Sequence, residues 1–152
     1  MTFKNKKVLV IGTGLSGIAA TKLLNQMNGL VILYDSNINL DKEEIYQKIG
    51  GRDQADIILG ELKEDIIKEL NLVVISPGVP TDLPMVQKLR EKGLTIWGET
   101  ELAYHFSKGK IIGITGTNGK TTTTALVGEI MKDFYESVFV VGNIGTPFTN
   151  VV

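Results

Sequence analysis

The segment 115–122 carries the residue types best suited to chemistry. In order, it consists of Thr115, Gly116, Thr117, Asn118, Gly119, Lys120, Thr121 and Thr122. An apolar run precedes it and a helical pattern follows it, so its backbone N–H groups can surround the β- and γ-phosphates of a nucleotide. Lys120 brings a positive charge to those phosphates, and the Thr121 hydroxyl can coordinate Mg²⁺. The segment therefore predicts a phosphate cradle.

This loop departs at one position from the common phosphate-loop pattern G-x-x-x-x-G-K-[ST]. The pattern requires glycine at position 114, where this chain has Ile114, and Gly113 lies one residue earlier. The departure is informative because it indicates a particular kind of phosphate loop. The alternative interpretation is a solvated turn of glycine, threonine and asparagine with an incidental lysine.

A second glycine-rich segment lies near the N-terminus, between a predicted strand and a predicted helix. It consists of Gly12, Thr13, Gly14, Leu15, Ser16 and Gly17. The glycines allow a tight turn and a close approach of the backbone to a pyrophosphate. That pyrophosphate would meet the free N–H groups and the positive dipole end of the helix. The alternative is a glycine-rich turn without a ligand.

Asp35 stands at the end of the second predicted strand, about 20 residues past these glycines, where nicotinamide enzymes use an acid to bind the ribose 2′-OH. The sequence therefore also fits a dehydrogenase fingerprint. Asp35 could equally be a solvated acid at the end of a strand, or the capping residue at the start of Asp35, Ser36 and Asn37.

Short apolar runs alternate with helical patterns up to residue 107, which is typical of βα units that form a mostly parallel sheet. The sequence predicts strands at 7–11, 30–34, 72–75 and 94–97, with a further short apolar run at 56–59. It predicts helical segments at 20–27, 42–49 and 62–70, from Pro84 onward, and at 99–106. The class is α/β.

A polar stretch at 107–110 separates this part from a second one, in which the βα rhythm restarts. We expect a strand at 110–115, the loop at 116–119, a helix at 121–134 and a strand at 138–141. The predicted apolar face of this helix comprises Val127, Ile130, Met131 and Phe134. The chain is thus predicted to be a Rossmann-like parallel sheet in residues 1–107, followed in 108–152 by the first βαβ segment of a P-loop ATPase domain.

The composition excludes several classes of protein. A hydrophobic fraction of 43% with 22% charged residues is ordinary for a globular chain, which argues against a disordered or fibrous protein. A net charge of −1 gives no electrostatic footprint for nucleic acid, and no run approaches the roughly 18 apolar residues of a membrane span. The absence of cysteine excludes disulfides and thiolate metal sites, and permits a reducing cytoplasm.

The segment 112–122 resembles the ATP loop of the Mur ligases, the ATP-dependent amino-acid ligases of peptidoglycan synthesis. Four further segments resemble the D-glutamate-adding branch of this family, namely 12–17, 76–80, 98–102 and 142–145. The resemblance extends over the whole chain in order. The alanine-adding branch usually carries histidine where Asn118 stands, and the folylpolyglutamate ligases share the ATP loop but lack a nucleotide-binding domain before it.

For residues 1–107, the resemblance implies a UDP-sugar-binding domain. The first loop, with Gly14, Leu15 and Ser16, would contact the UDP diphosphate. Asp35, Ser36 and Asn37 would hold the uracil, and Gly78 would approach the UDP-sugar. The family often has threonine and arginine at positions 36 and 37, so this chain departs from the family there.

For residues 108–152, the resemblance implies the truncated start of the central ATP-binding domain, with ATP and Mg²⁺ as cofactors. The implied ATP-site residues are Gly116, Thr117, Asn118, Gly119, Lys120, Thr121, Thr122 and Asn143. Thr121 is the implied Mg²⁺ ligand and Lys120 the implied catalytic residue. We expect Asn143 beside ATP, although Gly142 to Gly145 also reads as a simple turn.

The implied reaction adds D-glutamate to UDP-N-acetylmuramoyl-L-alanine through an acyl phosphate. Both partners are small molecules, and the resemblance implies a cytoplasmic monomer. The family's further metal-binding acid, its modified lysine and its third domain would lie beyond Val152. We therefore expect this chain to be inactive by itself.

Three rival hypotheses stay open on the residues alone. An NAD-dependent oxidoreductase explains the first loop and Asp35 but gives no reason for the lysine and threonines at 120–123. A P-loop NTPase switch leaves the first domain without a role, and a non-catalytic nucleotide-binding module is the third. His105 and Trp97 have no partners in the sequence that would make them catalytic, and we expect His105 at a surface or an interface.

Overall fold

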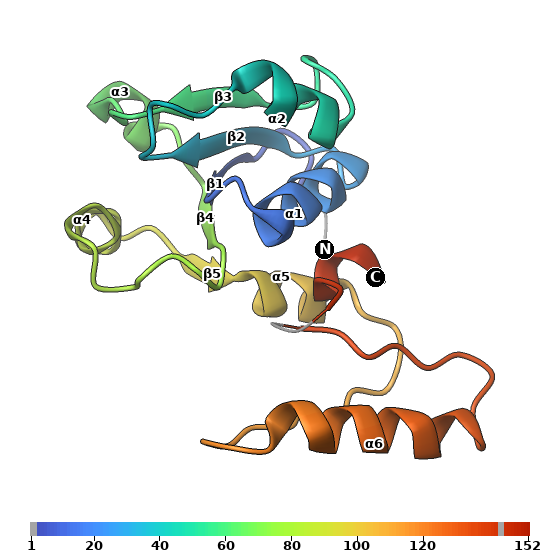
Figure 1. The fold of residues 1–152 in the computed structure, drawn as a ribbon. Coiled ribbons are helices and arrows are strands. Elements are labelled where there is room, and N and C mark those ends of the chain that lie inside the picture. The colour runs from blue at the N-terminus through green and yellow to red at the C-terminus, as the bar shows by residue number, and fades with distance from the viewer. Residues whose placement is uncertain (1–2, 143–144) are drawn as a thin grey trace.

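Five short apolar runs form a parallel sheet in the computed structural model, which describes residues 3–142 and 145–152 (Figure 1). The strands are β1 (Lys7–Ile11), β2 (Leu30–Asp35), β3 (Asp56–Leu59), β4 (Leu72–Ile75) and β5 (Ile96–Gly98). They lie in the order β3-β2-β1-β4-β5, and every neighbouring pair is parallel. The predicted α/β class and Rossmann-like sheet are confirmed.

Helices cover both faces of this sheet. Helices α1 (Leu15–Gln26), α2 (Lys42–Ile49) and α5 (Glu99–Phe106) contribute to one core, and α3 (Glu64–Lys68) and α4 (Pro84–Glu91) to the other. Local signals set several helix ends: the Asp41 side chain accepts from the Glu43 N–H at the start of α2, and Gly50 ends α2 in the left-handed conformation. The third helix is shorter than the predicted 62–70, because it has one buried residue, Ile67, to hold it against the sheet.

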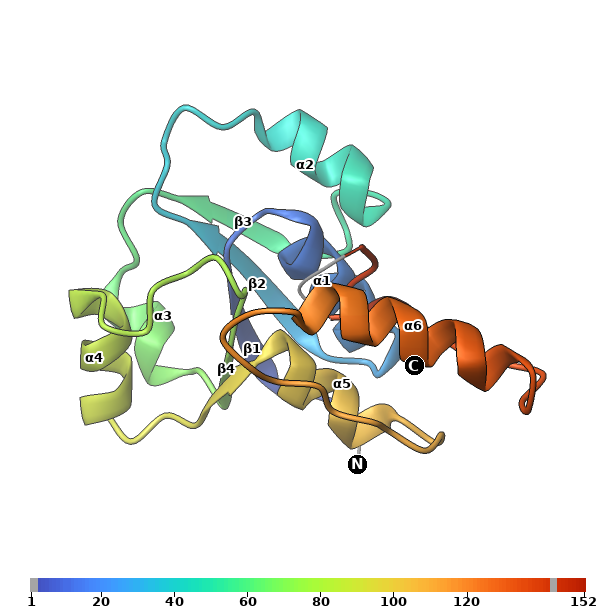
Figure 2. The same ribbon diagram turned by 60° about the horizontal axis from the view of Figure 1, so that its bottom comes forward.

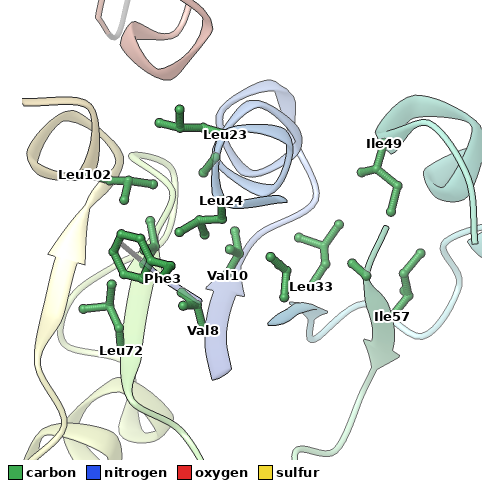
Figure 3. Close-up of a cluster of buried hydrophobic side chains, with 14 of the residues drawn as sticks. Phe3, Val8, Val10, Leu23, Leu24, Leu33, Ile49, Ile57, Leu72 and Leu102 are labelled. Atoms are coloured by element: carbon green, nitrogen blue, oxygen red, sulfur yellow. The ribbon is translucent and has the colours of Figure 1, made fainter. Parts of the chain in front are cut away.

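Alternation along β1 divides its side chains between the two cores. Val8 and Val10 join the cluster drawn in Figure 3, whereas Leu9 and Ile11 face the opposite cluster. Because successive side chains of a strand point to opposite faces, a strand covered on both faces must be apolar throughout. This explains the unbroken apolar run at 8–11, in which each residue is buried.

The strand order creates a switch point between β1 and β4. The chain proceeds from β1 outward to β2 and β3, then crosses to the other side of β1 and continues through β4 to β5. The loops that leave β1 and β4 therefore diverge at the carboxyl edge of the sheet. In open α/β sheets this divergence forms the crevice where ligands bind.

The second part of the chain contains a formed helix, α6 (Lys120–Lys132), but not the two strands predicted beside it. Residues 110–115 and 137–140 have no regular structure, and Val141 makes one isolated bridge to Thr146. A strand forms only where a neighbour satisfies its N–H and C=O groups, and the described residues of this part provide no such neighbour. Leu126 and Ile130 on α6, and Phe134 two residues after its end, are consequently exposed.

The last described residues return to the first part. The short 3-10 helix η1 (Phe148–Asn150) contacts α1 and α5, and Val152 packs against the core cluster of Figure 3. Figure 1 shows this segment beside α5, with α6 farther from the sheet. Figure 2, in which that side faces the viewer, shows α6 in front of the sheet. Among the described residues, no helix is long and apolar enough to span a membrane.

Candidate functional site

The first glycine loop, residues 12–17, is shaped by contacts that exclude larger side chains. A Cβ atom at Gly17 would lie 1.8 Å from the Gly12 carbonyl oxygen, which is far inside contact distance. Gly12 has a φ of +99°, a conformation that side chains rarely adopt. These two glycines let the turn after β1 close against the start of α1.

Gly14 has a different surrounding, because a Cβ atom there would meet nothing within 4 Å. The neighbouring Leu15 is 79% exposed, and no side chain in the described part of the chain caps the N-terminus of α1. The N–H groups in the first turn of a helix have no partner within the helix and attract anions. The outer side of the loop is thus open, and its donors suit a phosphate.

Ser76 adds a polar group to this place. It follows β4 and is 9% exposed, and its Oγ has no hydrogen-bond partner among the residues that the structure describes. The same oxygen would lie 3.0 Å from a Cβ atom at Gly12 and 3.1 Å from one at Gly17, so it borders the glycine loop. Buried hydroxyls are normally paired, so among the described residues Ser76 offers a hydroxyl without a partner beside the uncapped N-terminus of α1.

The carboxylate of Asp35 braces the glycine loop from the end of β2. Its Oδ2 accepts from the Thr13 N–H at 3.1 Å and from the Thr13 hydroxyl at 2.8 Å, and its Oδ1 accepts from the Asn37 N–H at 3.0 Å. Asp35 therefore joins the loop after β1 to the turn after β2. Ser36 and Asn37 are exposed beside it.

Tyr34 directly precedes Asp35 at the end of β2. Its hydroxyl donates to the Gly60 carbonyl at 2.7 Å, and its side chain is buried. Burial and the nearby charge of Asp35 raise the pKa of the Tyr34 phenol. The phenol therefore stays protonated and keeps its hydrogen bond at neutral pH.

A cavity of about 230 Å³ lies at the carboxyl ends of β4 and β5. Its wall includes Ser76, Val79, Glu99 and Thr100. Gly78 lies on the same loop as Ser76 and Val79 and is exposed, with open space where a Cβ atom would stand. The loop after β4 thus borders both the glycine loop and this cavity.

The second loop, residues 116–122, precedes and begins α6. Lys120 Nζ donates to the carbonyls of Gly116 at 2.7 Å and Thr117 at 3.2 Å, so the ammonium group lies over its own loop. Gly119 is the N-cap with a φ of 75°, and no side chain caps the helix. Asn118, Thr121 and Thr122 are exposed.

These groups fit a nucleotide phosphate with its metal ion. The uncapped N–H groups and Lys120 would face the phosphate oxygens, and the Thr121 hydroxyl is a suitable oxygen ligand for Mg²⁺. Within residues 3–142 and 145–152, no cluster of acidic, histidine or cysteine side chains could hold a metal ion alone.

The structure brings together one group of predicted residues and separates it from the other. Gly14, Leu15, Ser16, Asp35 and Ser36 lie at the carboxyl edge of β1 and β2, in the loop after β1, at the start of α1 and at the end of β2. The residues 116–122 instead adjoin α6, outside the layers of that sheet (Figures 1 and 2). Asn143, also predicted for the ATP site, lies outside the described residues.

Sequence reasoning missed three contributors to this region. The sequence assigns Thr13 no role of its own. Ser76 and Glu99 appear there only as members of the segments 76–80 and 98–102. The signal that could have singled out Ser76 is its place directly after a fully apolar strand. Thr13 and Glu99 could not be found in this way, because their partners are distant in the sequence.

His105 and Trp97 lie against each other, an aromatic contact that is not the orienting partner a catalytic base requires. Their rings stack with centroids 4.2 Å apart and an interplanar angle of 23°. His105 remains exposed, as expected for a surface side chain. The sequence hides this contact because Trp97 belongs to β5 and His105 to the last turn of α5.

Two family models match this chain. Residues 6–98 match the model described as "Mur ligase MurD-like, N-terminal domain". Residues 114–150 match the model described as "Mur ligase middle domain".

Curated relatives match along the whole chain. UDP-N-acetylmuramoylalanine–D-glutamate ligases are 59% identical in Lachnoclostridium phytofermentans and 53% identical in Lachnospira eligens, in each case over all 152 residues. The homologous ligase of Clostridioides difficile is 42% identical. The chain spans about a third, 34%, of the length of each of these three relatives.

Solved structures show the same fold. A pseudomurein peptide ligase type C from Methanothermus fervidus is 28% identical, with a TM-score of 0.54 over 85% of this chain and 26% of its own. A murein peptide ligase from Psychrobacter arcticus is 20% identical, with a TM-score of 0.56 over 84% of this chain and 26% of its own, and it shows the fold alone.

Proposed function

Because this chain belongs to the Mur ligase family and has a MurD-like N-terminal domain, we propose that residues 1–107 bind the UDP-sugar substrate of a D-glutamate-adding ligase. Residues 108–152 would then be the start of its ATP-binding domain. The proposed substrates are UDP-N-acetylmuramoyl-L-alanine, D-glutamate and ATP. The net charge of −1 agrees with small-molecule partners rather than nucleic acid.

The proposed reaction proceeds in two balanced steps. The substrate carboxylate attacks the γ-phosphorus of ATP, which forms an acyl phosphate and releases ADP. The amine of D-glutamate then attacks the acyl carbon, so that an amide forms, inorganic phosphate leaves and the amine loses a proton. Lys120 would stabilise the charge of the transferred phosphoryl group, and Mg²⁺ would neutralise the phosphate oxygens.

The observation that carries the proposal is the unpaired Ser76 hydroxyl beside the glycine loop. A diphosphate on the open side of Gly14 would meet the uncapped N–H groups of α1 and lie near this buried donor. One ligand would thus complete the hydrogen bonding of both groups.

The hydrogen bonds that Asp35 already accepts favour uracil, rather than the ribose of a dinucleotide, as its ligand. A carboxylate has about four acceptor positions, and Asp35 already uses three, two for Thr13 and one for Asn37. The position left on Oδ1 suits a single donor such as the imide N–H of uracil. A ribose that presents two hydroxyls would have to displace the contacts that brace the loop.

Titration calorimetry tests the proposal directly, with the UDP-sugar and NADH as competing ligands for the 152-residue chain. We expect the UDP-sugar to bind more tightly. Tighter binding of NADH would favour an oxidoreductase. Binding of neither ligand would contradict the proposed site and leave the fold assignment without a function.

A pair of variants identifies the site in the same titration. Ser76→Ala should weaken UDP-sugar binding by roughly 2- to 10-fold, the value of one hydrogen bond, without loss of thermal stability, because this hydroxyl has no partner to lose. Thr21→Val is the matched control, since Thr21 Oγ1 is also buried and unpaired but lies within α1. Equal affinities for both variants and the unmodified chain would place the ligand elsewhere.

A further inference from the structure

We propose that Glu99 is a positioning residue that holds the ATP-binding part of the chain in a defined place relative to the first domain. Its role in the reaction rests on the proposed function, whereas the contact itself does not. Glu99 belongs to the segment 98–102, which the proposed binding sites do not otherwise use.

The contact is a buried carboxylate that receives two hydrogen bonds from one residue. Glu99 Oε1 accepts from the Thr149 N–H and from the Thr149 hydroxyl, each at 2.7 Å. Glu99 is 2% exposed and Thr149 is 4% exposed. Both hydrogen bonds are short, and burial protects them from competition with water.

The position of Glu99 connects this contact to the first domain. Glu99 is the first residue of α5, directly after β5, and it borders the cavity at the carboxyl ends of β4 and β5. Its second oxygen, Oε2, accepts a long hydrogen bond from the Thr100 hydroxyl at 3.5 Å. The carboxylate therefore lies between the proposed substrate domain and η1.

The other side of the contact continues toward α6. Thr146, three residues before Thr149, accepts from the Gly142 N–H at 3.1 Å and forms a bridge with Val141. The adjacent Val140 side chain lies against Gly128 of α6, where a Cβ atom would be 2.4 Å from Val140 Cγ2. An unbroken series of contacts thus leads from Glu99 to the helix that begins with Lys120.

Apolar packing alone would not define this geometry. Phe148 is buried and Val152 packs against the first core, so the segment would adhere to the first domain without Glu99. Hydrophobic contacts are non-directional, whereas two hydrogen bonds to one oxygen specify an orientation. We therefore assign the orientation of residues 145–152, and through it that of α6, to Glu99.

A distance measurement between the two parts tests this inference. The chain has no cysteine, so spin labels at Gln47→Cys on α2 and Ala125→Cys on α6, both exposed positions, report one distance by pulsed electron resonance. In the 152-residue chain we expect a narrow distance distribution. Glu99→Ala should broaden it at least about twofold, because the directional bonds are lost and the apolar contacts are kept.

Two variants separate positioning from simple stabilisation. Glu99→Gln should restore the narrow distribution, because its amide oxygen can accept both hydrogen bonds. Glu101→Ala, an exposed acid in the same first turn of α5, should leave the distribution unchanged. A role of Glu99 confined to the stability of α5 would lower the melting temperature without broadening the distances, and that result would overturn the proposal.

Hydrogen exchange decides the matter if Glu99→Ala does not fold. Thr149→Val keeps the carboxylate but removes one of its two donors, and we expect the peptide 145–152 to exchange about 3- to 10-fold faster while β1 and β4 stay protected. Unchanged exchange in 145–152 would contradict the proposal. Neither measurement uses a nucleotide, so failure of the UDP-sugar titration would leave this result standing.

Discussion

At the scale of single residues, Gly17 and Gly14 lie three positions apart in one loop and have opposite surroundings. Gly17→Ala should destabilise the fold by several kcal/mol, on the order of the largest single-residue effects, because its Cβ atom would lie 1.8 Å from a backbone oxygen. Gly14→Ala should leave stability nearly unchanged, since nothing lies within 4 Å. Urea denaturation of both variants measures this difference.

The same pair separates the roles of the two glycines in binding. A methyl group at Gly14 occupies the space proposed for the diphosphate, so Gly14→Ala should weaken UDP-sugar binding in a folded protein. A Gly17→Ala variant as stable as the unmodified chain would show that the turn after β1 differs from the structure.

Lys120 is the residue on which the proposed ATP chemistry depends most. In the full-length enzyme, Lys120→Ala should reduce ligation by roughly 10²- to 10³-fold, which is typical for the loss of one preorganised electrostatic contact. Folding should persist, because Lys120 is exposed and its ammonium group donates to carbonyls of its own loop. Steady-state kinetics with a UDP-sugar binding assay measures both properties.

UDP-sugar affinity should be unchanged in Lys120→Ala, since the proposed sugar site lies in the other domain. If ligation stayed at its normal rate, residues 115–122 would be a structural turn and the ATP-dependent mechanism would be wrong.

At the scale of elements, α3 and α4 are joined on the surface by one acid and two lysines. Glu64 on α3 forms ion pairs with Lys88 and, at 2.9 Å, with Lys92 at the end of α4. Hydrogen bonds from Lys88 and then Lys92 lower the pKa of Glu64 from 4.5 to about 2. Since the folded pKa is the lower one, this carboxylate stabilises the fold above the unfolded pKa and loses that effect as pH falls toward about 2.

Glu64→Gln should therefore lower the free energy of unfolding slightly near neutral pH and have no effect near pH 2. The contribution is small and sensitive to salt, because these side chains are exposed to solvent. Urea titrations at about pH 6 and about pH 2, in low and high salt, measure it. Glu61→Gln, an exposed acid three residues earlier, is the control. An equal effect of Glu64→Gln at both pH values would contradict the ion-pair explanation.

At the scale of the whole molecule, the two parts differ in how far their apolar surfaces are covered. The first part has a buried apolar cluster on each face of its sheet, whereas Leu126 and Ile130 on α6 and Phe134 just after it are exposed. The curated relatives are about three times as long as this chain, which spans 34% of their length.

This arrangement predicts that the 152-residue chain binds a UDP-sugar but does not ligate. With ATP, Mg²⁺, D-glutamate and UDP-N-acetylmuramoyl-L-alanine, a coupled assay should detect phosphate release at background. The reason is that the phosphate loop adjoins a helix without its sheet, and the described residues include no acid cluster for the metal ion. Clear turnover would show that the catalytic groups are already present in this chain.

The sequence by itself determined the α/β class, the first sheet and the positions of both loops. Five apolar runs alternate with helical patterns, and the first loop follows one of them, so local information was sufficient for the sheet. The second loop follows a further apolar run, which forms no strand. Glu99–Phe106 even agrees with its predicted helix at both ends. The two strands predicted around α6 were wrong, because a strand depends on neighbours that local periodicity does not reveal.

Tertiary structure alone decided which side chains meet. The bonds of Asp35 to Thr13 span 22 residues and those of Glu99 to Thr149 span 50, and no spacing rule relates such pairs. The unpaired state of Ser76 likewise depends on the crossing of the chain from β3 to β4, which places the loops after β1 and β4 side by side. Periodicity reports which face of an element is buried, whereas contacts between distant elements arise only when the sheet assembles.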